Sequence, residues 1–289
     1  MEKRVTSHNL SIITFNTFGV PFDGNKIFKS FLRTSIRKRF KVIGKLLNNS
    51  DADIIALQEI YTFTHLNILK KELSNYSYCY YKKFLIAPRG GVVTFSKFPM
   101  EEVEYSDFKH KGNWYNKSFV GKMSGRGLLI TKIKGHPIYI GNTHLTQNSD
   151  EEFKESNKFY NMLESQLKDI TDVVNLLSMN NQVILTGDFN LPKNIHLYNN
   201  FLSSTKLIDT FGGILEPTKH KEFLFAKDYL ECIDYIFVTK SAGVSCANSS
   251  HLFTEKAEIS KGLLSYLSDH IALKVDISFN TTSLETPKD

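Results

Sequence analysis

The segment Val-Ile-Leu-Thr-Gly-Asp-Phe-Asn at residues 183–190 places a carboxylate and an amide directly after an apolar run. Its first residues are β-branched or aliphatic, which favours a buried strand. Asp188 and Asn190 lie two positions apart, so on an extended chain they share a face and can address one ligand. A buried carboxylate without a partner is energetically costly, so Asp188 requires one. The segment predicts a buried strand that ends in two residues, Asp188 and Asn190, able to bind one ligand.

Five other short apolar runs carry polar residues in a similar way. They contribute Asn16, Glu59, His144, Asp234, and the adjacent pair Asp269 and His270. A single residue of this kind is more often a helix cap, a satisfied turn or a core hydrogen bond. Six such positions reverse that expectation, because strand ends at one edge of a sheet converge on one site. We therefore expect these side chains to meet.

The chemistry of this set favours phosphate-ester hydrolysis with Mg²⁺ as cofactor and Mn²⁺ as a substitute. Glu59 and Asn16 offer the hard oxygen ligands that Mg²⁺ prefers. Zinc fits poorly, since the cysteines form no CxxC motif and no two histidines stand at helical spacing. His144 and His270 can transfer protons or donate hydrogen bonds to phosphate near neutral pH.

The hydrophobic pattern elsewhere predicts a mixed α/β sandwich. Apolar residues recur at helical spacing over 27–49 and 152–178, which predicts two helices. Two of the predicted strands are separated by Lys-Gly-His and read as a hairpin, which disfavours a purely parallel sheet. Strands are predicted at 10–15, 53–57, 91–95, 127–133, 137–142, 182–186, 232–238 and 271–277.

Composition excludes several classes of protein. The chain has 289 residues, 41% of them hydrophobic and 23% charged, which excludes collagen-like and wholly disordered chains. We expect a single catalytic domain over 1–280 and a polar tail over 281–289. No apolar run reaches the roughly 18 residues of a membrane span, and no signal peptide is evident. We expect a soluble monomer, cytoplasmic or exported by a route not visible in the sequence. The net charge of +6 favours an anionic partner.

Six segments, taken in order, resemble the endonuclease/exonuclease/phosphatase superfamily, which shares the fold of pancreatic deoxyribonuclease. They are Thr14-Phe15-Asn16, Ala56-Leu57-Gln58-Glu59, Asn142-Thr143-His144-Leu145, Gly187-Asp188-Phe189-Asn190, Ile233-Asp234-Tyr235 and Leu267-Ser268-Asp269-His270. The resemblance covers nearly the whole chain. It implies a four-layer α/β/β/α sandwich with two mixed, mainly antiparallel sheets, a bound Mg²⁺, and in-line attack of water on a phosphodiester or phosphomonoester.

The resemblance also implies a role for each residue on the metal side of the site. Glu59 would be the principal metal ligand. Asn16 would contact the metal or the phosphate beside it, and Asp269 would be a further carboxylate on the same side.

The remaining residues would transfer protons or bind the phosphate. By the same resemblance, His270 would be the general base and Asp234 the carboxylate that orients it. Asp188 would either orient the nucleophile or protonate the leaving oxygen. Asn190 and His144 would bind the phosphate and stabilise the transition state.

Two segments are similar to the neutral sphingomyelinases in particular. Asn-Thr-Phe-Gly-Val-Pro-Phe at 16–22 is similar to their Asn-x-aromatic-Gly-(Ile/Val)-Pro opening, whereas abasic-site endonucleases usually continue with another Asn, then Gly and Arg. Gly-Val-Val-Thr-Phe-Ser-Lys-Phe-Pro at 91–99 is similar to their Gly-Leu-x-x-Phe-Ser-Lys-x-Pro stretch. The resemblance implies a phosphodiesterase that releases the phosphorylated head group of a phospholipid.

A basic and aromatic loop in the middle of the chain lies where those enzymes carry a loop beside the substrate. We expect Trp114, Lys117, Lys122 and Arg126 to bind the substrate there, with peripheral contact to a membrane. The apolar triplet at 223–225 is a second candidate for that contact.

Three alternatives stay open. A nuclease of the same fold, acting on DNA or RNA, is favoured by the isoelectric point of about 9.0. The chain lacks the interleaved basic and aromatic stretches of strong nucleic-acid binders, however. The superfamily also contains inositol-phosphate phosphatases. A phosphate-binding module without turnover is the last alternative, and the complete set of polar residues argues against it.

Overall fold

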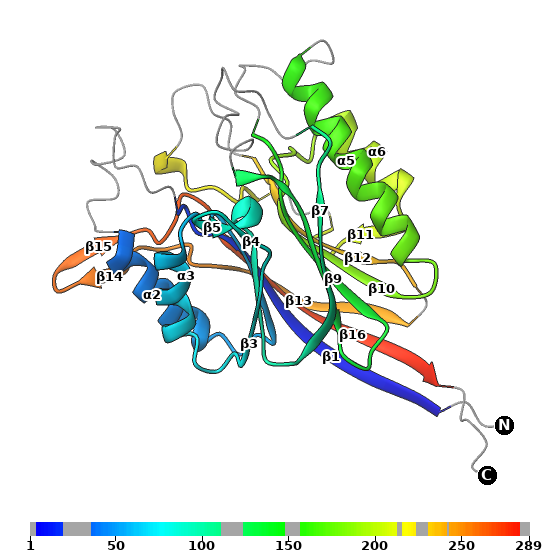
Figure 1. The fold of residues 1–289 in the computed structure, drawn as a ribbon, viewed down its shortest axis with the longest axis horizontal. Coiled ribbons are helices and arrows are strands. Elements are labelled where there is room, and N and C mark those ends of the chain that lie inside the picture. The colour runs from blue at the N-terminus through cyan, green and yellow to red at the C-terminus, as the bar shows by residue number, and fades with distance from the viewer. Residues whose placement is uncertain are drawn as a thin grey trace.

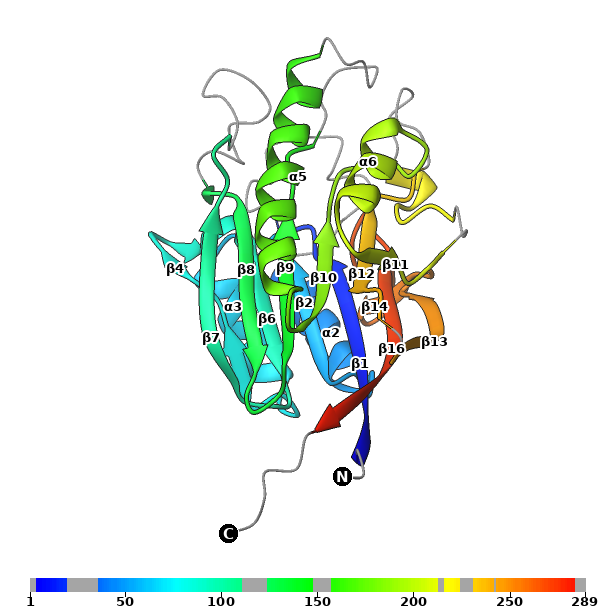
Figure 2. The same ribbon diagram turned by 90° about the vertical axis from the view of Figure 1, so that its right-hand side faces the viewer.

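Two sheets packed face to face form the centre of the molecule, and helices cover both outer faces (Figure 1). The turned view of Figure 2 shows α5 and α6 lying over one of the sheets. The computed structural model describes residues 4–19, 36–110, 124–147, 157–212, 216–223, 231–241 and 243–283.

The first sheet contains the two long strands nearest the chain ends. Its strands are β1 (Arg4–Asn16), β2 (Ile54–Gln58), β3 (Tyr78–Tyr80), β6 (Val93–Ser96), β13 (Val244–Leu252) and β16 (Ala272–Ser283). Their order is β13-β16-β1-β2-β6-β3. Strands β1 and β2 are parallel, and the other neighbours in this described sheet are antiparallel.

The second sheet repeats this plan. Its strands are β7 (Met100–Asp107), β8 (Gly127–Ile133), β9 (Ile138–His144), β10 (Gln182–Asp188), β11 (Leu207–Asp209) and β12 (Asp234–Thr239). Their order is β11-β12-β10-β9-β8-β7. Here β9 and β10 form the parallel pair, flanked by antiparallel neighbours on both sides.

Amphipathic helices form the outer layers. Helices α2 (Ile36–Asn48) and α3 (Phe63–Glu72) bury their apolar faces against the first sheet. Helices α5 (Lys158–Leu177) and α6 (His196–Ser204) do the same against the second. The start of α5 is fixed by Asn157, whose side chain accepts a hydrogen bond from the Phe159 amide.

Aliphatic side chains fill the space between the sheets. Ile12, Ile54, Ile140, Ile184 and Val275 have no exposed surface. Full burial of such side chains stabilises the fold by roughly 1.5–3 kcal/mol each. The order of layers is therefore helix, sheet, sheet, helix, which confirms the predicted four-layer α/β/β/α sandwich with two mixed, mainly antiparallel sheets.

Several short elements complete the described chain. They are β4 (Lys83–Phe84), β5 (Ala87–Pro88), the 3₁₀ turns η1 (Arg89–Gly91) and η2 (Lys221–Phe223), β14 (Ala257–Ser260) and β15 (Leu263–Ser265). β4 pairs with β5, and β14 with β15.

Each predicted strand corresponds to an observed one, and the predicted hairpin is the antiparallel pair β8–β9. The sequence prediction missed helices α3 and α6 and the peripheral strands β3, β7, β11 and β13. β13 alternates exposed and partly exposed residues and packs only at a sheet edge, so it lacks the continuous apolar run by which the central strands were identified.

One predicted boundary differs from the structure, and two others fall outside the described residues. β16 continues to Ser283 and pairs with β1 there, so the first residues of the expected tail belong to a strand. The expected starts of the two long helices, at 27 and 152, fall outside the described residues. None of the helices in the described part is long and apolar enough to cross a membrane.

Candidate active site

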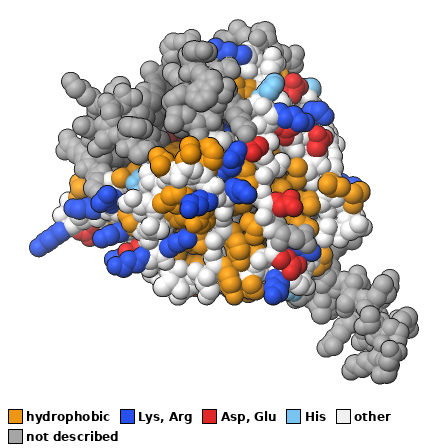
Figure 3. Space-filling model, in the orientation of Figure 1, with side chains coloured by type: hydrophobic (Ala, Val, Ile, Leu, Met, Phe, Trp, Pro, Cys, Tyr) orange, Lys and Arg blue, Asp and Glu red, His pale blue; other side chains and the backbone are white. Residues whose placement is uncertain are grey.

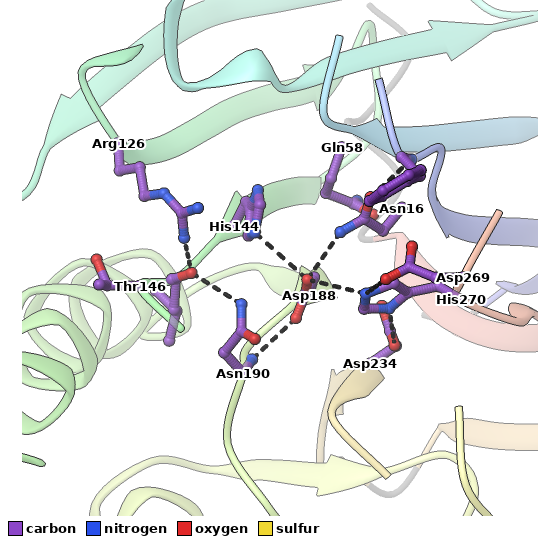
Figure 4. A network of polar contacts seen from close by, with 12 residues as sticks. Asn16, Gln58, Arg126, His144, Thr146, Asp188, Asn190, Asp234, Asp269 and His270 are labelled. Carbon is purple, nitrogen blue, oxygen red and sulfur yellow. Dashed lines mark hydrogen bonds and ion pairs between the residues drawn. The ribbon is translucent and has the colours of Figure 1, made fainter. Parts of the chain in front are cut away.

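The parallel strand pairs of both sheets end at the same place. In the first sheet Asn16 is in register with Gln58, and in the second Asp188 is in register with His144. Gly187 permits the close approach of the second pair, since its φ is 144° and a Cβ there would lie 2.0 Å from the Thr143 carbonyl oxygen. The strand ends thus bring together side chains from distant parts of the chain (Figure 4).

Asp188 is the centre of the polar network. Its Oδ2 accepts a hydrogen bond from Asn16 Nδ2 at 2.9 Å and lies 3.3 Å from His144 Nε2. Its Oδ1 accepts from the Asn190 backbone amide at 2.9 Å. Burial, together with the charge of Asp234, raises the pKa of Asp188 to about 6. The donors around it hold this carboxylate in one orientation.

His270 and Asp234 form a dyad that faces Asp188. His270 Nδ1 is 2.8 Å from Asp234 Oδ2, and its Nε2 lies 3.8 Å from carboxylate oxygens of both Asp188 and Asp269. Burial lowers the pKa of His270, but Asp234, Asp269 and Asp188 outweigh it and raise the pKa to about 10. One imidazole nitrogen is thus fixed by Asp234, and the other is directed into the site.

Two hydroxyl groups that the sequence analysis did not single out hold this dyad. Ser268 Oγ accepts from the His270 amide at 3.1 Å and donates to the Asn16 carbonyl at 2.6 Å. Thr218 Oγ1 accepts from the Asp234 amide at 3.2 Å, and both hydroxyls are fully buried. The Ser-Asp-His run was visible in the sequence, whereas Thr218 stands in a segment with no other signal.

Glu59 follows β2 in a constrained backbone conformation. Its φ is 64°, and a Cβ on Gly19 would lie 1.8 Å from the Glu59 carbonyl oxygen. Its Oε2 is buried and has no hydrogen-bond partner among the described residues. Burial, with the charges of Asp269 and Asp188, raises the pKa of Glu59 to about 7.

A buried carboxylate oxygen without a hydrogen-bond partner, such as Glu59 Oε2, is a suitable ligand for a divalent cation. Glu59, with the charge of Asp269 acting on it, supplies the hard oxygen donors that Mg²⁺ or Mn²⁺ prefers. The Asn16 amide oxygen, which accepts from the Phe18 amide, could contribute its second lone pair. Asp188, Asp234 and His270 also bring ligand atoms within 4.8 Å of one another. In that second group, however, two of the residues are already paired with each other at 2.8 Å. Asp234 Oδ1 is also buried without a partner, but the other oxygen of that carboxylate is held by His270. The Glu59 carboxylate has no such partner among the described residues, which favours Glu59 as the centre of the cation site.

Arg39 is a functional candidate that the sequence analysis missed. This α2 residue is only 2% exposed and donates to the carbonyls of Thr17, Phe18 and Leu267. It thereby ties the segment after Asn16 to the segment before Asp269. Burial lowers its pKa to about 10, against the opposing charges of Asp269 and Glu59, and the side chain stays protonated. Its position on the apolar stripe of the helix was the available signal.

A buried amide pair joins the two sheets beneath the site. Gln58 Nε2 donates to Asn142 Oδ1 at 2.8 Å, and Asn142 Nδ2 donates to the Val93 carbonyl at 3.0 Å. Both side chains have no exposed surface. Amides inside otherwise apolar strands were visible in the sequence, but their partners were not.

The phosphate-side candidates gather at the Leu145 carbonyl. Asn190 Nδ2 donates to it at 3.0 Å, and Arg126 Nη1 donates to the same oxygen. Burial, then the charges of Arg126 and His270, hold the pKa of His144 well below its ordinary value, so this imidazole is neutral. Arg126 is 7% exposed and lies in the wall of the site.

The other expected substrate-binding residues cannot be compared with the structure. Trp114, Lys117 and Lys122 lie outside the described residues, and so do residues 224 and 225 of the second apolar candidate.

A family model with the description "Endonuclease/Exonuclease/phosphatase family" matches residues 13–270, a span that contains every residue of this network. The chain belongs to this family. Its members hydrolyse phosphoester bonds, so the network at the strand ends is the expected place of that chemistry. No curated protein matches the chain by sequence.

Solved structures share the fold of this family member. A family protein from Bacteroides thetaiotaomicron has a TM-score of 0.71 at 19% identity, covering 98% of this chain and 100% of the other. Beta toxin from Staphylococcus aureus has a TM-score of 0.70 at 18% identity, covering 92% and 99%. TDP2 from C. elegans has a TM-score of 0.67 at 20% identity, covering 94% and 75%. One beta toxin structure contains bound magnesium ions.

Proposed function

We propose that this protein is a Mg²⁺-dependent phosphodiesterase of neutral-sphingomyelinase type, which hydrolyses the head-group phosphodiester of a phospholipid. One observation carries the proposal: a buried histidine–carboxylate dyad lies across a common site from a buried carboxylate oxygen without a partner. The dyad suits proton transfer from water, and the unpaired oxygen suits a cation.

His270 is the base in this proposal. Its Nε2 takes a proton from water while Asp234 keeps the proton on Nδ1 and stabilises the imidazolium. Asp188, 3.8 Å from that Nε2, orients the water for the transfer. The oxygen of water then attacks phosphorus, and the bond from phosphorus to the lipid oxygen breaks. The leaving oxygen takes a proton from solvent, and His270 releases the proton it received to solvent.

Neutral and cationic donors stabilise the phosphate. Asn190 and Arg126 each donate one N–H group to the Leu145 carbonyl, and their remaining N–H groups, including the buried and unpaired Arg126 Nε, can donate to a phosphate oxygen. Neutral His144 contributes a further N–H group without adding positive charge. Such preorganised donors commonly contribute the largest share of the rate enhancement.

The charge balance of the site also supports a cation. A bound Mg²⁺ would neutralise phosphate charge and polarise the phosphorus–oxygen bonds. The carboxylates around His270 raise its pKa to about 10, which favours the protonated imidazole and opposes its action as a base. It can accept a proton only when part of the surrounding carboxylate charge is neutralised, and Asp269 and Glu59 are the residues that would hold the neutralising ion.

The substrate is argued from two sequence segments. Residues 16–22 and 91–99 depart from nucleases and are similar to sphingomyelinases. Their described residues contact the neighbours of Glu59, because Thr17 N donates to the Gln58 carbonyl and Ile60 N donates to the Gly91 carbonyl. One segment is thus joined to the residue before Glu59 and the other to the residue after it.

Parallel assays test the proposal. We expect the purified protein with Mg²⁺ to cleave sphingomyelin in preference to lysophospholipid, inositol phosphates and plasmid DNA. Glu59→Gln is the matched inactive control for each assay. Cleavage of plasmid DNA without hydrolysis of any lipid would overturn the substrate assignment and favour the nuclease, which the net charge of +6 also supports.

A further inference from the structure

The β4–β5 hairpin carries an unusual turn. β4 and β5 pair through Lys83↔Pro88 and Phe84↔Ala87, which leaves Leu85 and Ile86 as the two turn residues. Two-residue hairpin turns are normally built from Gly, Asn or Asp, since the backbone needs positive φ angles. Leu85 has a φ of 29° here. Large aliphatic residues in this turn are locally unfavourable, and such exceptions concentrate at functional sites.

Both turn side chains are exposed to solvent. Leu85 is 79% exposed and Ile86 is 77% exposed, the highest values among the large hydrophobic side chains of the described residues. Figure 3 shows hydrophobic side chains gathered over β4 and β5, with Lys and Arg side chains beside them. An apolar tip of this kind marks an interaction surface.

Backbone hydrogen bonds and a cation–π contact anchor the hairpin to the body of the protein with its tip exposed. The Ile86 carbonyl accepts from the Phe63 amide at 3.1 Å, at the start of α3. The Lys82 carbonyl accepts from the Arg89 amide at 2.7 Å and closes the hairpin base. The Arg89 guanidinium lies over the Phe84 ring, 4.7 Å from its centroid.

The charge around the tip is basic. Lys82 and Lys83 are exposed next to the turn in sequence. Lys70, on the neighbouring helix α3, lies over the Tyr81 ring at 4.9 Å. An apolar tip with a lysine rim matches the surface of a bilayer, where acyl chains lie below anionic phosphate groups.

The hairpin is also connected directly to the proposed cation site. β5 leads into η1, and the Gly91 carbonyl at its end accepts from the Ile60 amide at 2.9 Å, the residue after Glu59. A Cβ on Gly91 would lie 3.4 Å from Glu59 Cα. Only a few residues therefore separate the exposed tip from the expected metal ligand.

We propose that Leu85 and Ile86 insert into the head-group region of a phospholipid bilayer, with Lys82 and Lys83 on the anionic lipid phosphates, and that this contact presents lipid to the site at Glu59. The proposal rests on the proposed function, since it assigns a docking surface for the phospholipid substrate. It differs from the contact expected at Trp114 and 223–225.

Sedimentation with vesicles tests the docking surface separately from catalysis. The full chain is mixed, in EDTA to prevent hydrolysis, with vesicles of phosphatidylcholine and phosphatidylserine at about 4:1. We expect Leu85→Asp with Ile86→Asp to weaken vesicle binding by about tenfold or more, since partitioning scales with inserted apolar area. Lys82→Glu with Lys83→Glu should remove the preference for vesicles that contain phosphatidylserine.

The chain offers a matched control for the added charge and the lost apolar area. Leu176 and Met179, at the end of α5, are each 64% exposed. Leu176→Asp with Met179→Asp should leave vesicle binding unchanged, and the tip variant should hydrolyse the soluble diester bis(p-nitrophenyl) phosphate like the unmodified protein.

Each result has a distinct meaning. Equal vesicle binding by the tip variant and the control variant would overturn the docking proposal, as would binding of duplex DNA, and not of vesicles, that the lysine reversal weakens. Tip-dependent vesicle binding without lipid hydrolysis in Mg²⁺ would support the docking surface and contradict the proposed function.

Discussion

The two parallel strand pairs have the same surroundings and different ends. In each sheet the pair is flanked by antiparallel strands, β16 and β6 around β1–β2, and β12 and β8 around β10–β9. The first pair ends on the amides Asn16 and Gln58 and leads to the unpartnered carboxylate oxygen of Glu59. The second ends on Asp188 and His144, which lie 3.3 Å apart.

This difference explains how one scaffold can supply two kinds of chemistry. The backbone brings the strand ends to one place in both sheets, but side-chain pairing decides what remains available there. In the second pair, Asp188 accepts hydrogen bonds from the Asn16 side chain and the Asn190 amide and can orient water and phosphate. The first leaves negative charge uncompensated, which calls for a cation.

The largest expected effect on activity comes from replacing Glu59, which follows the first strand pair. Glu59→Gln should reduce phosphodiesterase activity by about a thousandfold or more, since the metal supplies several kcal/mol of charge stabilisation. Thermal unfolding should show Mg²⁺ stabilising the unmodified protein, by about 2.7 kcal/mol at 100 times the dissociation constant, and not the variant. Activity that survives EDTA would contradict the metal assignment.

The same substitution has an expected pH signature without metal. The pKa of Glu59 is raised from its ordinary 4.5 to about 7, so the folded state disfavours the ionised form. The unmodified protein should therefore lose stability relative to Glu59→Gln as pH rises from about 4.5 towards 7. Denaturant unfolding in EDTA at several pH values measures this gap. A stability difference that does not change with pH would mean that the pKa of Glu59 is not raised in the folded state.

Substitutions in the dyad should have the next largest effect. His270→Ala and Asp234→Asn should each lower kcat by about 10²–10⁴-fold, the usual contribution of general-base catalysis. The double variant should be little worse than His270→Ala alone, because the carboxylate acts through the imidazole. Kinetics with a soluble phosphodiester checks this, and fully additive losses would show that the residues do not act as a unit.

Arg39 should have a smaller effect, on position rather than chemistry. Arg39→Lys keeps the charge but cannot reach three carbonyls with one planar group. We expect kcat to fall by about tenfold and the stability by about 1–3 kcal/mol, since buried carbonyls lose their donors. Mg²⁺ affinity should also weaken, because Arg39 fixes the segments that carry Asn16 and Asp269. Arg37→Lys, on the exposed side of the same helix, is the control and should change none of these quantities.

The smallest expected effect is on stability alone. Asn142→Leu removes the amide that joins the sheets. Gln58 Nε2 loses its shortest acceptor, at 2.8 Å, and the buried Val93 carbonyl loses its donor. We expect unfolding free energy to fall by about 1–3 kcal/mol. Replacing both amides with Leu should recover part of this loss, which calorimetry can measure. A double variant less stable than Asn142→Leu would show that the two amides stabilise the fold by more than the hydrogen bond between them.

The sequence predicted the central strands because each is a continuous apolar run that ends on a polar residue. It also predicted that Asp188, His270 and Asp234 lie together, and their contacts now show how. It could not predict Thr218 or the three carbonyls around Arg39, because those partners lie far apart in the chain and a hydroxyl or arginine alone gives no signal. The edge strand β13 was missed for a similar reason, since its half-exposed residues follow no buried pattern.

Isothermal titration calorimetry with Mg²⁺ tests most directly whether the ion binds at Glu59, after the first strand pair, or at the group of Asp188, Asp234 and His270. Three proteins suffice: the unmodified chain, Glu59→Gln and Asp234→Asn. We predict that Glu59→Gln abolishes Mg²⁺ binding and that Asp234→Asn retains it, because Asp234 is already held by His270 at 2.8 Å, whereas the buried Glu59 Oε2 has no partner among the described residues. Loss of binding in Asp234→Asn with binding intact in Glu59→Gln would place the ion at Asp188, Asp234 and His270 and contradict the account.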